Sequence, residues 1–145
     1  MSAPALLIFL VFALPASAID IRSYRIPDLL VFPGFAAVFI FLLSSRAGVL
    51  PDRVAASLLS GLFFFIIRRF TGALGLGDVK FAMLIGLCCG LPWVCVAFLA
   101  ASLMGIGFIL ILRRGKQERI PLPFAPFLTA GVIAAFVFSR FLRFF

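Results

Sequence analysis

The sequence predicts an all-α protein, a single integral membrane domain over residues 1–145 built as a polytopic bundle of about six transmembrane helices. Hydrophobic residues make up 65% of the chain, its mean hydropathy is +1.29, and its charged residues gather in short stretches between apolar runs. A soluble domain of this length could not bury so much apolar surface, because most residues of a small fold contact water. Lipid is therefore the expected solvent for most of the chain.

The apolar runs give the bounds of the expected spans. The longest run, from Val79 to Leu112, would form a helix of about 51 Å, which exceeds a hydrocarbon core of about 30 Å. We expect it to break at the turn Gly90-Leu91-Pro92-Trp93, although the first of the two resulting helices is short for a span. The expected spans are residues 3–19, 29–45, 54–67, 79–90, 93–112 and 122–138.

The first span has an alternative interpretation as a cleaved signal peptide. An apolar stretch is followed there by Ala16-Ser17-Ala18, a run of small residues of the kind found at cleavage sites. The amino end, however, has none of the Lys or Arg residues that begin a signal peptide. We therefore expect the first helix to be retained.

Basic residues between the spans predict the orientation of the bundle. The net charge of +8 is best explained by basic residues that set the membrane orientation and contact anionic lipid headgroups, rather than by binding of nucleic acid. The side with more Lys and Arg is expected to face the cytoplasm, so that both termini lie outside. That side holds Arg22, Arg25, Arg68, Arg69, Lys80, Arg113, Arg114, Lys116 and Arg119, and the other side holds Arg46, Arg53, Arg140 and Arg143.

Asp20, at the end of the first expected span, and Asp78, at the start of the fourth, fall on the same expected cytoplasmic side. A carboxylate at a membrane boundary is a candidate functional group because its burial there is costly. Two carboxylates that lie close together tend to share one proton and can activate a water molecule between them. The alternative for each is a helix cap or an ion pair with a nearby Arg, and we expect Asp28, after Pro27, to be such an N-cap.

The remaining acids and the cysteines have simpler explanations. Asp52 lies beside Arg53 in the outer loop, and Glu118 lies among basic residues in a solvated loop. Zinc sites usually combine closely spaced Cys pairs with His, and the chain has no His and no CxxC pair. We therefore expect no metal and no cofactor. We expect all three cysteines to be buried as small hydrophobic residues: Cys88, Cys89 and Cys95.

The sequence around Asp78 indicates close helix packing. The run from Gly72 to Asp78 is too rich in glycine for a stable helix. Asp78, Ala82, Gly86 and Gly90 then recur every four residues and share one narrow helix face, which permits close contact with another helix in lipid. The amino end of that helix would stabilise an ionised Asp78.

Three blocks of the sequence resemble the GxGD membrane aspartyl proteases, and among them the type IV prepilin peptidases in their short, peptidase-only form. They are Asp20 with Arg25-Ile26-Pro27-Asp28, then Gly75-Leu76-Gly77-Asp78-Val79-Lys80, and last Ile120-Pro121-Leu122-Pro123-Phe124-Ala125-Pro126-Phe127 with Gly131. The chain departs from the family pattern at Ala125, where Gly is usual, so a geometry that needs positive φ is in question there. Asp28 stands where many members have Asn, and Phe81 where Leu is common.

This resemblance implies an aspartic endopeptidase that removes the leader peptide of type IV prepilin-like precursors at the cytoplasmic face of the inner membrane. It implies that Asp20 and Asp78 are catalytic, that Gly75 and Gly77 admit substrate backbone, and that Lys80 positions Asp78 or contacts lipid. Pro123 and Pro126 would help to shape the site. The expected partners are prepilin-like precursors and lipid, without nucleic acid.

Two other functions stay open at this point. One is an ion- or proton-coupled transporter or assembly subunit, in which intramembrane aspartates relay protons or bind cations. The other is a GxGD protease that cuts different substrates, such as remnant signal peptides. The three blocks in family order favour the prepilin peptidase.

Overall fold

The computed structural model describes residues 2–45, 47–72, 74–112 and 123–142. These residues form six α-helices and one short 3₁₀ turn without any strand, which confirms the predicted all-α class. The predicted loop with Glu118, residue 122 of the sixth expected span, and Ile120-Pro121-Leu122 of the third block lie outside the described residues. The elements are α1 (Ala3–Ser23), α2 (Asp28–Ser45), η1 (Ala47–Val49), α3 (Leu50–Thr71), α4 (Leu76–Cys89), α5 (Leu91–Leu112) and α6 (Ala125–Phe141).

Four helical stretches in the described part of the chain are long and apolar enough to cross a membrane: Ala3–Ser23, Asp28–Ser45, Ala47–Thr71 and Leu91–Ile111. The helix Ala125–Phe141 is apolar but shorter. Helix α4 has only 14 residues, so it is about 21 Å long and shorter than a hydrocarbon core of about 30 Å. The chain is a multi-pass membrane protein whose shortest helix cannot reach both interfaces.

Several helices extend beyond the apolar runs that predicted them, most of all α1 and α3. Helix α1 continues to Ser23 instead of ending at Ile19, and α3 covers Leu50–Thr71 instead of residues 54–67. The last turn of α3 holds Arg68 and Arg69, whose charges suit the negative end of a helix. Gly72, at φ +64°, then ends the helix in a left-handed conformation. An apolar run marks lipid contact, whereas caps decide where a helix ends.

The small-residue face of α4 packs closely against another helix, as the sequence predicted, and the structure shows that this helix is α3. Ala82 is fully buried, and a Cβ atom at Gly86 would lie 2.5 Å from the carbonyl oxygen of Ala56 in α3. The predicted break also occurs, because Gly90 has φ +78° and alone separates α4 from α5. At this end of α4 the Arg53 guanidinium donates a hydrogen bond to the carbonyl of Cys88.

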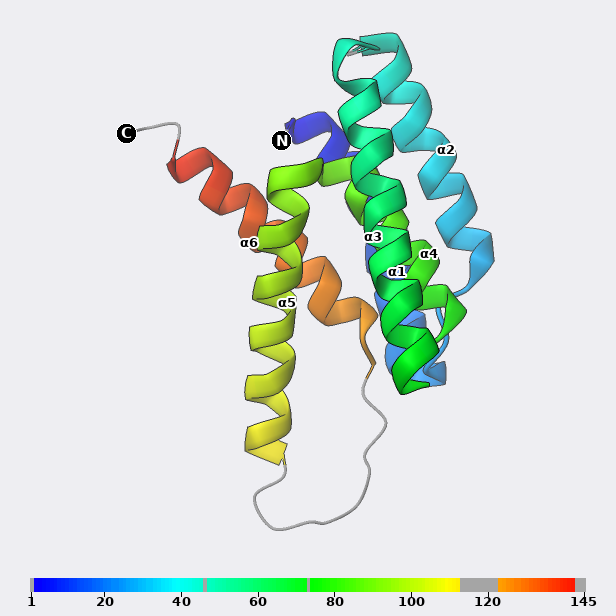
Figure 1. The fold of residues 1–145 in the computed structure, drawn as a ribbon, viewed down its shortest axis with the longest axis vertical. Helices are drawn as coiled ribbons and strands as arrows, with labels where there is room; N and C mark the ends of the chain where they lie inside the picture. Colours follow the sequence, from blue (N-terminus) through cyan, green and yellow to red (C-terminus); the bar gives the residue numbers. More distant parts are fainter. Residues whose placement is uncertain (1, 46, 73, 113–122, 143–145) are drawn as a thin grey trace.

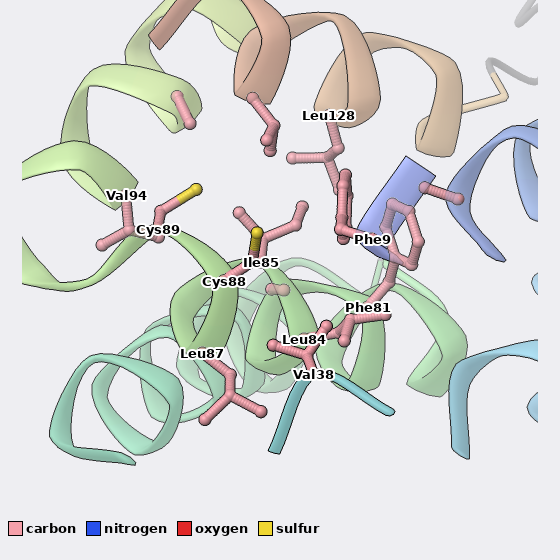
Figure 2. Close-up of a cluster of buried hydrophobic side chains, with 14 of the residues drawn as sticks. Phe9, Val38, Phe81, Leu84, Ile85, Leu87, Cys88, Cys89, Val94 and Leu128 are labelled. Atoms are coloured by element: carbon pink, nitrogen blue, oxygen red, sulfur yellow. The ribbon is translucent and has the colours of Figure 1, made fainter. Parts of the chain in front are cut away.

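Helix α4 is the centre of the hydrophobic core. Figure 2 shows its buried side chains, among them Phe81, Leu84 and Ile85, facing residues of the helices around it. Those neighbours are Phe9 of α1, Val38 of α2, Val94 of α5 and Leu128 of α6.

The three cysteines do not share one environment. Cys88 and Cys89 are buried, as predicted, whereas Cys95 is exposed, and the prediction was wrong for that residue. Cys95 belongs to α5, a long apolar helix that presents many side chains outward, so an apolar sequence around a cysteine does not by itself indicate burial.

Helices α5 and α6 form a pair beside the other four (Figure 1). They approach closely at Gly131 of α6, where a Cβ atom would overlap the carbonyl oxygen of Ala97. Helix α6 crosses from α5 toward α1, and its first residues lie against the last turn of α1. The amino end of α6 is thereby held next to Asp20.

Candidate active site

Asp20 lies in the last turn of α1, and its side chain is 4% exposed. Its Oδ2 accepts a hydrogen bond of 3.0 Å from the backbone N–H of Ala125, the first residue of α6. The first amide groups of a helix have no partner within the helix and carry partial positive charge. Asp20 therefore caps a helix other than its own.

The described part of the third block, Pro123 to Phe127, forms the start of α6. Pro126 is the second residue of the helix, where the missing N–H of proline removes no internal hydrogen bond. Tyr24 is the only described residue other than glycine with positive φ, so the helical start at Ala125 does not need the glycine that the family usually has. Phe124 lines the pocket described below, whereas Pro123 and Pro126 do not line it.

Asp78 is the third residue of α4, and its side chain caps its own helix. Its Oδ2 accepts a hydrogen bond of 2.9 Å from the backbone N–H of Gly75, the N-cap residue. The helix consequently begins at Leu76, earlier than the predicted start at Val79, and the expectation that the whole glycine-rich run is non-helical was wrong. A carboxylate at the third position that reaches back to the N-cap amide is a common way to start a helix.

The two carboxyl groups meet at one open pocket. Asp20 and Asp78 both line a cavity of about 830 Å³ between the end of α1 and the start of α4. Burial raises the pKa of Asp78 above its ordinary value; the hydrogen bond from Gly75 opposes this rise, and the charge of Asp20 adds to it. In each residue Oδ2 is engaged by a backbone N–H, so the second oxygen of each carboxyl can face a water molecule or a substrate.

The connection between α1 and α2 forms one wall of this pocket. Tyr24 ends α1 in the left-handed conformation, with φ 51°, and Ile26 turns back onto the start of α4. A Cβ atom at Gly77 would lie 3.0 Å from the Cβ and 3.2 Å from the carbonyl oxygen of Ile26. Gly77 therefore packs against Ile26 of its own chain, and it also lines the pocket. That it admits substrate backbone stays a prediction. Gly75 is exposed and lines the pocket.

Lys80 pairs with Asp28 across the rim of the pocket. The Lys80 Nζ lies 2.6 Å from Asp28 Oδ2 and 5.1 Å from the centre of the Phe32 ring. Lys80 also lines the pocket, and that it positions Asp78 or contacts lipid stays a prediction. The two side chains are 34% and 53% exposed, so their ion pair contributes little to stability.

The expectation that Asp28 is an N-cap was wrong by one residue. The carbonyl of Pro27 accepts the first amide hydrogen bonds of α2, from Leu30 and Val31, so Pro27 occupies the cap position. Asp28 is the first helical residue, where its charge still suits the positive end of α2.

Several functional features of the pocket could not be found in the sequence. The residue that bonds Asp20 contributes only its backbone N–H, which no side-chain pattern reveals. Pro126 was a usable signal, because proline in the first turn marks a helix start. Tyr24 gave no signal, since tyrosine rarely adopts positive φ. In the described ranges, no three His, Cys, Asp or Glu side chains are grouped in a way that could hold a metal ion.

The fold and the pocket define a multi-pass membrane protein with two aspartates on one cavity. The chain belongs to the type IV leader peptidase family, which its sequence matches over residues 7–110. This range includes Asp20 and Asp78 and ends before the third block.

Curated relatives give the same family. The chain is 28% identical over 137 residues to a prepilin leader peptidase/N-methyltransferase of Xanthomonas campestris, covering 86% of this chain and 47% of the relative. For a protein of the same name from Pseudomonas aeruginosa, the identity is 32% over 130 residues, covering 83% of this chain and 45% of the relative. A leader peptidase of Escherichia coli, HopD, is 33% identical over 130 residues, covering 66% of this chain and 83% of the relative.

The chain thus spans about half the length of the prepilin leader peptidase/N-methyltransferases described above. No solved structure matches it.

Proposed function

We propose that this protein is a membrane aspartyl endopeptidase that cleaves the leader peptide of type IV prepilin-like precursors, with Asp20 and Asp78 as the catalytic pair. One observation carries the proposal: two carboxyl groups from α1 and α4 meet at one open pocket, each oriented by a backbone amide at a helix start. Membership of the type IV leader peptidase family supports the substrate class. The family assignment does not favour a transporter that uses the same aspartates.

The pair would work by sharing one proton. Two carboxyl groups that lie close together resist double ionisation, so in the proposed mechanism one acts as a carboxylate and the other as an acid. The carboxylate takes a proton from a bound water molecule while the water oxygen attacks the scissile carbonyl carbon, and the acid gives its proton to the carbonyl oxygen. The carboxyl that took the proton from water then gives it to the amide nitrogen, while the other carboxylate takes a proton from the diol, and the C–N bond breaks. The chemistry needs no group beyond the two side chains and water.

We propose that residues 1–145 act as one peptidase domain in the inner membrane, with the pocket on the cytoplasmic side. The excess of Lys and Arg at the α1–α2 connection, at the end of α3 and at the start of α4 supports this orientation. A precursor whose apolar segment lies in the membrane would then present its leader at the level of the pocket.

The test is co-expression with candidate precursors that carry a short leader before an apolar segment. We expect a shortened product in membranes that contain the wild-type chain, with a new amino terminus at one position, identified by mass spectrometry. Precursors that stay intact with wild-type protein, while a characterised leader peptidase cuts them in the same membranes, would contradict the proposal.

A further inference from the structure

Two buried hydroxyl groups join α1 to α6 beside Asp20. The Oγ of Ser17 lies 2.9 Å from the Oγ1 of Thr129, and the two residues are 6% and 3% exposed. They are separated by 112 positions in the sequence. Most side chains around them are apolar, so each hydroxyl needs a partner to offset the cost of its burial.

The direction of these hydrogen bonds follows from counting protons. The Thr129 hydroxyl donates to the carbonyl of Ala125, at 2.9 Å, and a hydroxyl has one proton to donate. Ser17 must therefore donate to Thr129. A hydrogen-bonded chain runs from Ser17 through Thr129 to the carbonyl of Ala125, the residue whose N–H holds the Asp20 carboxylate.

The two contacts between α1 and α6 lie one helical turn apart. Ser17 precedes Asp20 by three residues, which is about 4.5 Å along α1, and Thr129 follows Ala125 by four residues, which is about 6 Å along α6. Helix α1 ends near Asp20 and α6 begins there, so the two helices run in opposite directions. The bonds Asp20–Ala125 and Ser17–Thr129 are two successive contacts between them. If only one of these two hydrogen bonds held the helices, either helix could rotate or slide relative to the other.

We propose that Ser17 and Thr129 are positioning residues that hold α6 in register with α1, so that the Ala125 N–H stays aligned on the Asp20 carboxylate. This inference rests on the proposed function, in which Asp20 is catalytic. Neither Ser17 nor Thr129 lines the pocket, so the hydroxyl pair acts only through Asp20. Removal of either hydroxyl should therefore slow the chemical step and leave substrate binding largely intact.

The first experiment measures cleavage of a precursor by Ser17→Ala, Thr129→Val and the double variant, each normalised to folded protein in the membrane. Thr129→Val keeps the shape of the side chain and removes the hydroxyl. We expect kcat to fall about tenfold in each single variant while KM changes less than about twofold, since small misalignments near a reacting group have effects of this size. The double variant should be no slower than the singles, because each removes the same bond.

Two further variants serve as controls. Ser139→Ala removes another buried hydroxyl of α6, one that bonds only to the carbonyl of Phe136 in its own helix, and it should leave kcat unchanged. Thr129→Ser keeps the hydroxyl and should retain wild-type kcat within about twofold. Wild-type kcat in Ser17→Ala and Thr129→Val, or an equal loss in Ser139→Ala, would overturn the proposal. So would loss of the folded bundle in both single variants, because the pair would then hold the fold rather than the carboxylate.

A second measurement separates this proposal from the proposed function. The infrared difference between wild type and Asp20→Asn isolates the carboxyl band of Asp20 without any substrate. We expect Ser17→Ala and Thr129→Val to shift this band and Ser139→Ala to leave it in place. A shifted band in a protein that cuts no precursor would support the positioning role and refute the peptidase. An unshifted band in an active protein would refute the positioning role alone.

Discussion

The two aspartates of the pocket are held in opposite ways. Asp78 is held locally, by the amide of Gly75 three residues before it, and it sits at the start of its own helix. Asp20 sits at the end of its helix, where the carbonyl groups disfavour a negative charge, and it depends on the amide of Ala125, 105 residues away. The first environment forms whenever α4 forms, whereas the second exists only when α6 is in place.

This difference assigns distinct structural roles to the helices. Helix α4 carries Asp78 within the core and is fixed at its other end by the bond from Arg53 to the Cys88 carbonyl. Helix α6 contributes no acidic side chain in its described residues but supplies the amide that orients Asp20. A disturbance of α5 or α6 should therefore affect Asp20 more than Asp78, even when it occurs far from the pocket.

The largest expected effect of such a disturbance is at Gly131. In Gly131→Ala the new methyl group would overlap the backbone of α5 at Ala97, so α6 must move away and the Ala125 amide with it. We expect precursor cleavage to fall at least about a hundredfold, and the free energy of unfolding to fall by about 1–3 kcal/mol. Cleavage rates and thermal unfolding in detergent measure the two effects.

Gly105→Ala is the matched control for this variant. Gly105 lies in the middle of α5, and a Cβ atom there would meet no heavy atom within 4 Å. Alanine is also the better helix former, so stability should stay the same or rise slightly. Equal losses in Gly105→Ala and Gly131→Ala would show that Asp20 does not depend on the α5–α6 contact.

A smaller effect is expected at Gly77, beside Asp78. In Gly77→Ala the methyl group would press on the side chain and the carbonyl of Ile26, which displaces the α1–α2 connection from the pocket wall. We expect cleavage to fall about tenfold while the bond from Gly75 to Asp78 keeps α4 intact. Gly48→Ala, where a Cβ would meet nothing within 4 Å, should cleave like wild type. Wild-type rates in Gly77→Ala would mean that the Ile26 contact does not shape the pocket.

The smallest effect is expected for the exposed ion pair. Asp28→Asn and Lys80→Met each remove the ion pair between α2 and α4, and exposed pairs contribute less than about 1 kcal/mol. We expect cleavage to stay within about threefold of wild type, with a weaker response to added salt. If Lys80→Met lost as much cleavage as Asp20→Asn or Asp78→Asn, Lys80 would instead have a role in catalysis.

The sequence could predict what depends on neighbouring residues. The spacing of Asp78, Ala82, Gly86 and Gly90 predicted that α4 packs closely on another helix, and Gly90 predicted the break before α5. The helix class and the place of both aspartates on one side followed from apolar runs and basic residues. Helices α1 and α3 were predicted too short, because capping and charge, rather than apolar composition, decide where they end.

What the sequence could not predict depends on residues far apart in the chain. The bond between Asp20 and Ala125 joins a side chain to a backbone amide, and the pair of Lys80 with Asp28 links charges 52 positions apart. Both require knowledge of which helices pack together. In the sequence, Ser17 stands out only as part of the Ala16-Ser17-Ala18 pattern. Its spacing of three residues from Asp20 nevertheless places both on one helix face.

The central claim, that Asp20 and Asp78 act as one catalytic unit, is tested most directly by precursor cleavage in membranes with Asp20→Asn, Asp78→Asn and the double variant. Asparagine keeps the shape of the side chain and removes its acid–base function. We expect each single variant to retain less than about 1% of wild-type cleavage and the double variant to be no lower, because groups that act as a unit do not add. All three should insert in the membrane like wild type. Substantial cleavage by either single variant would contradict the account.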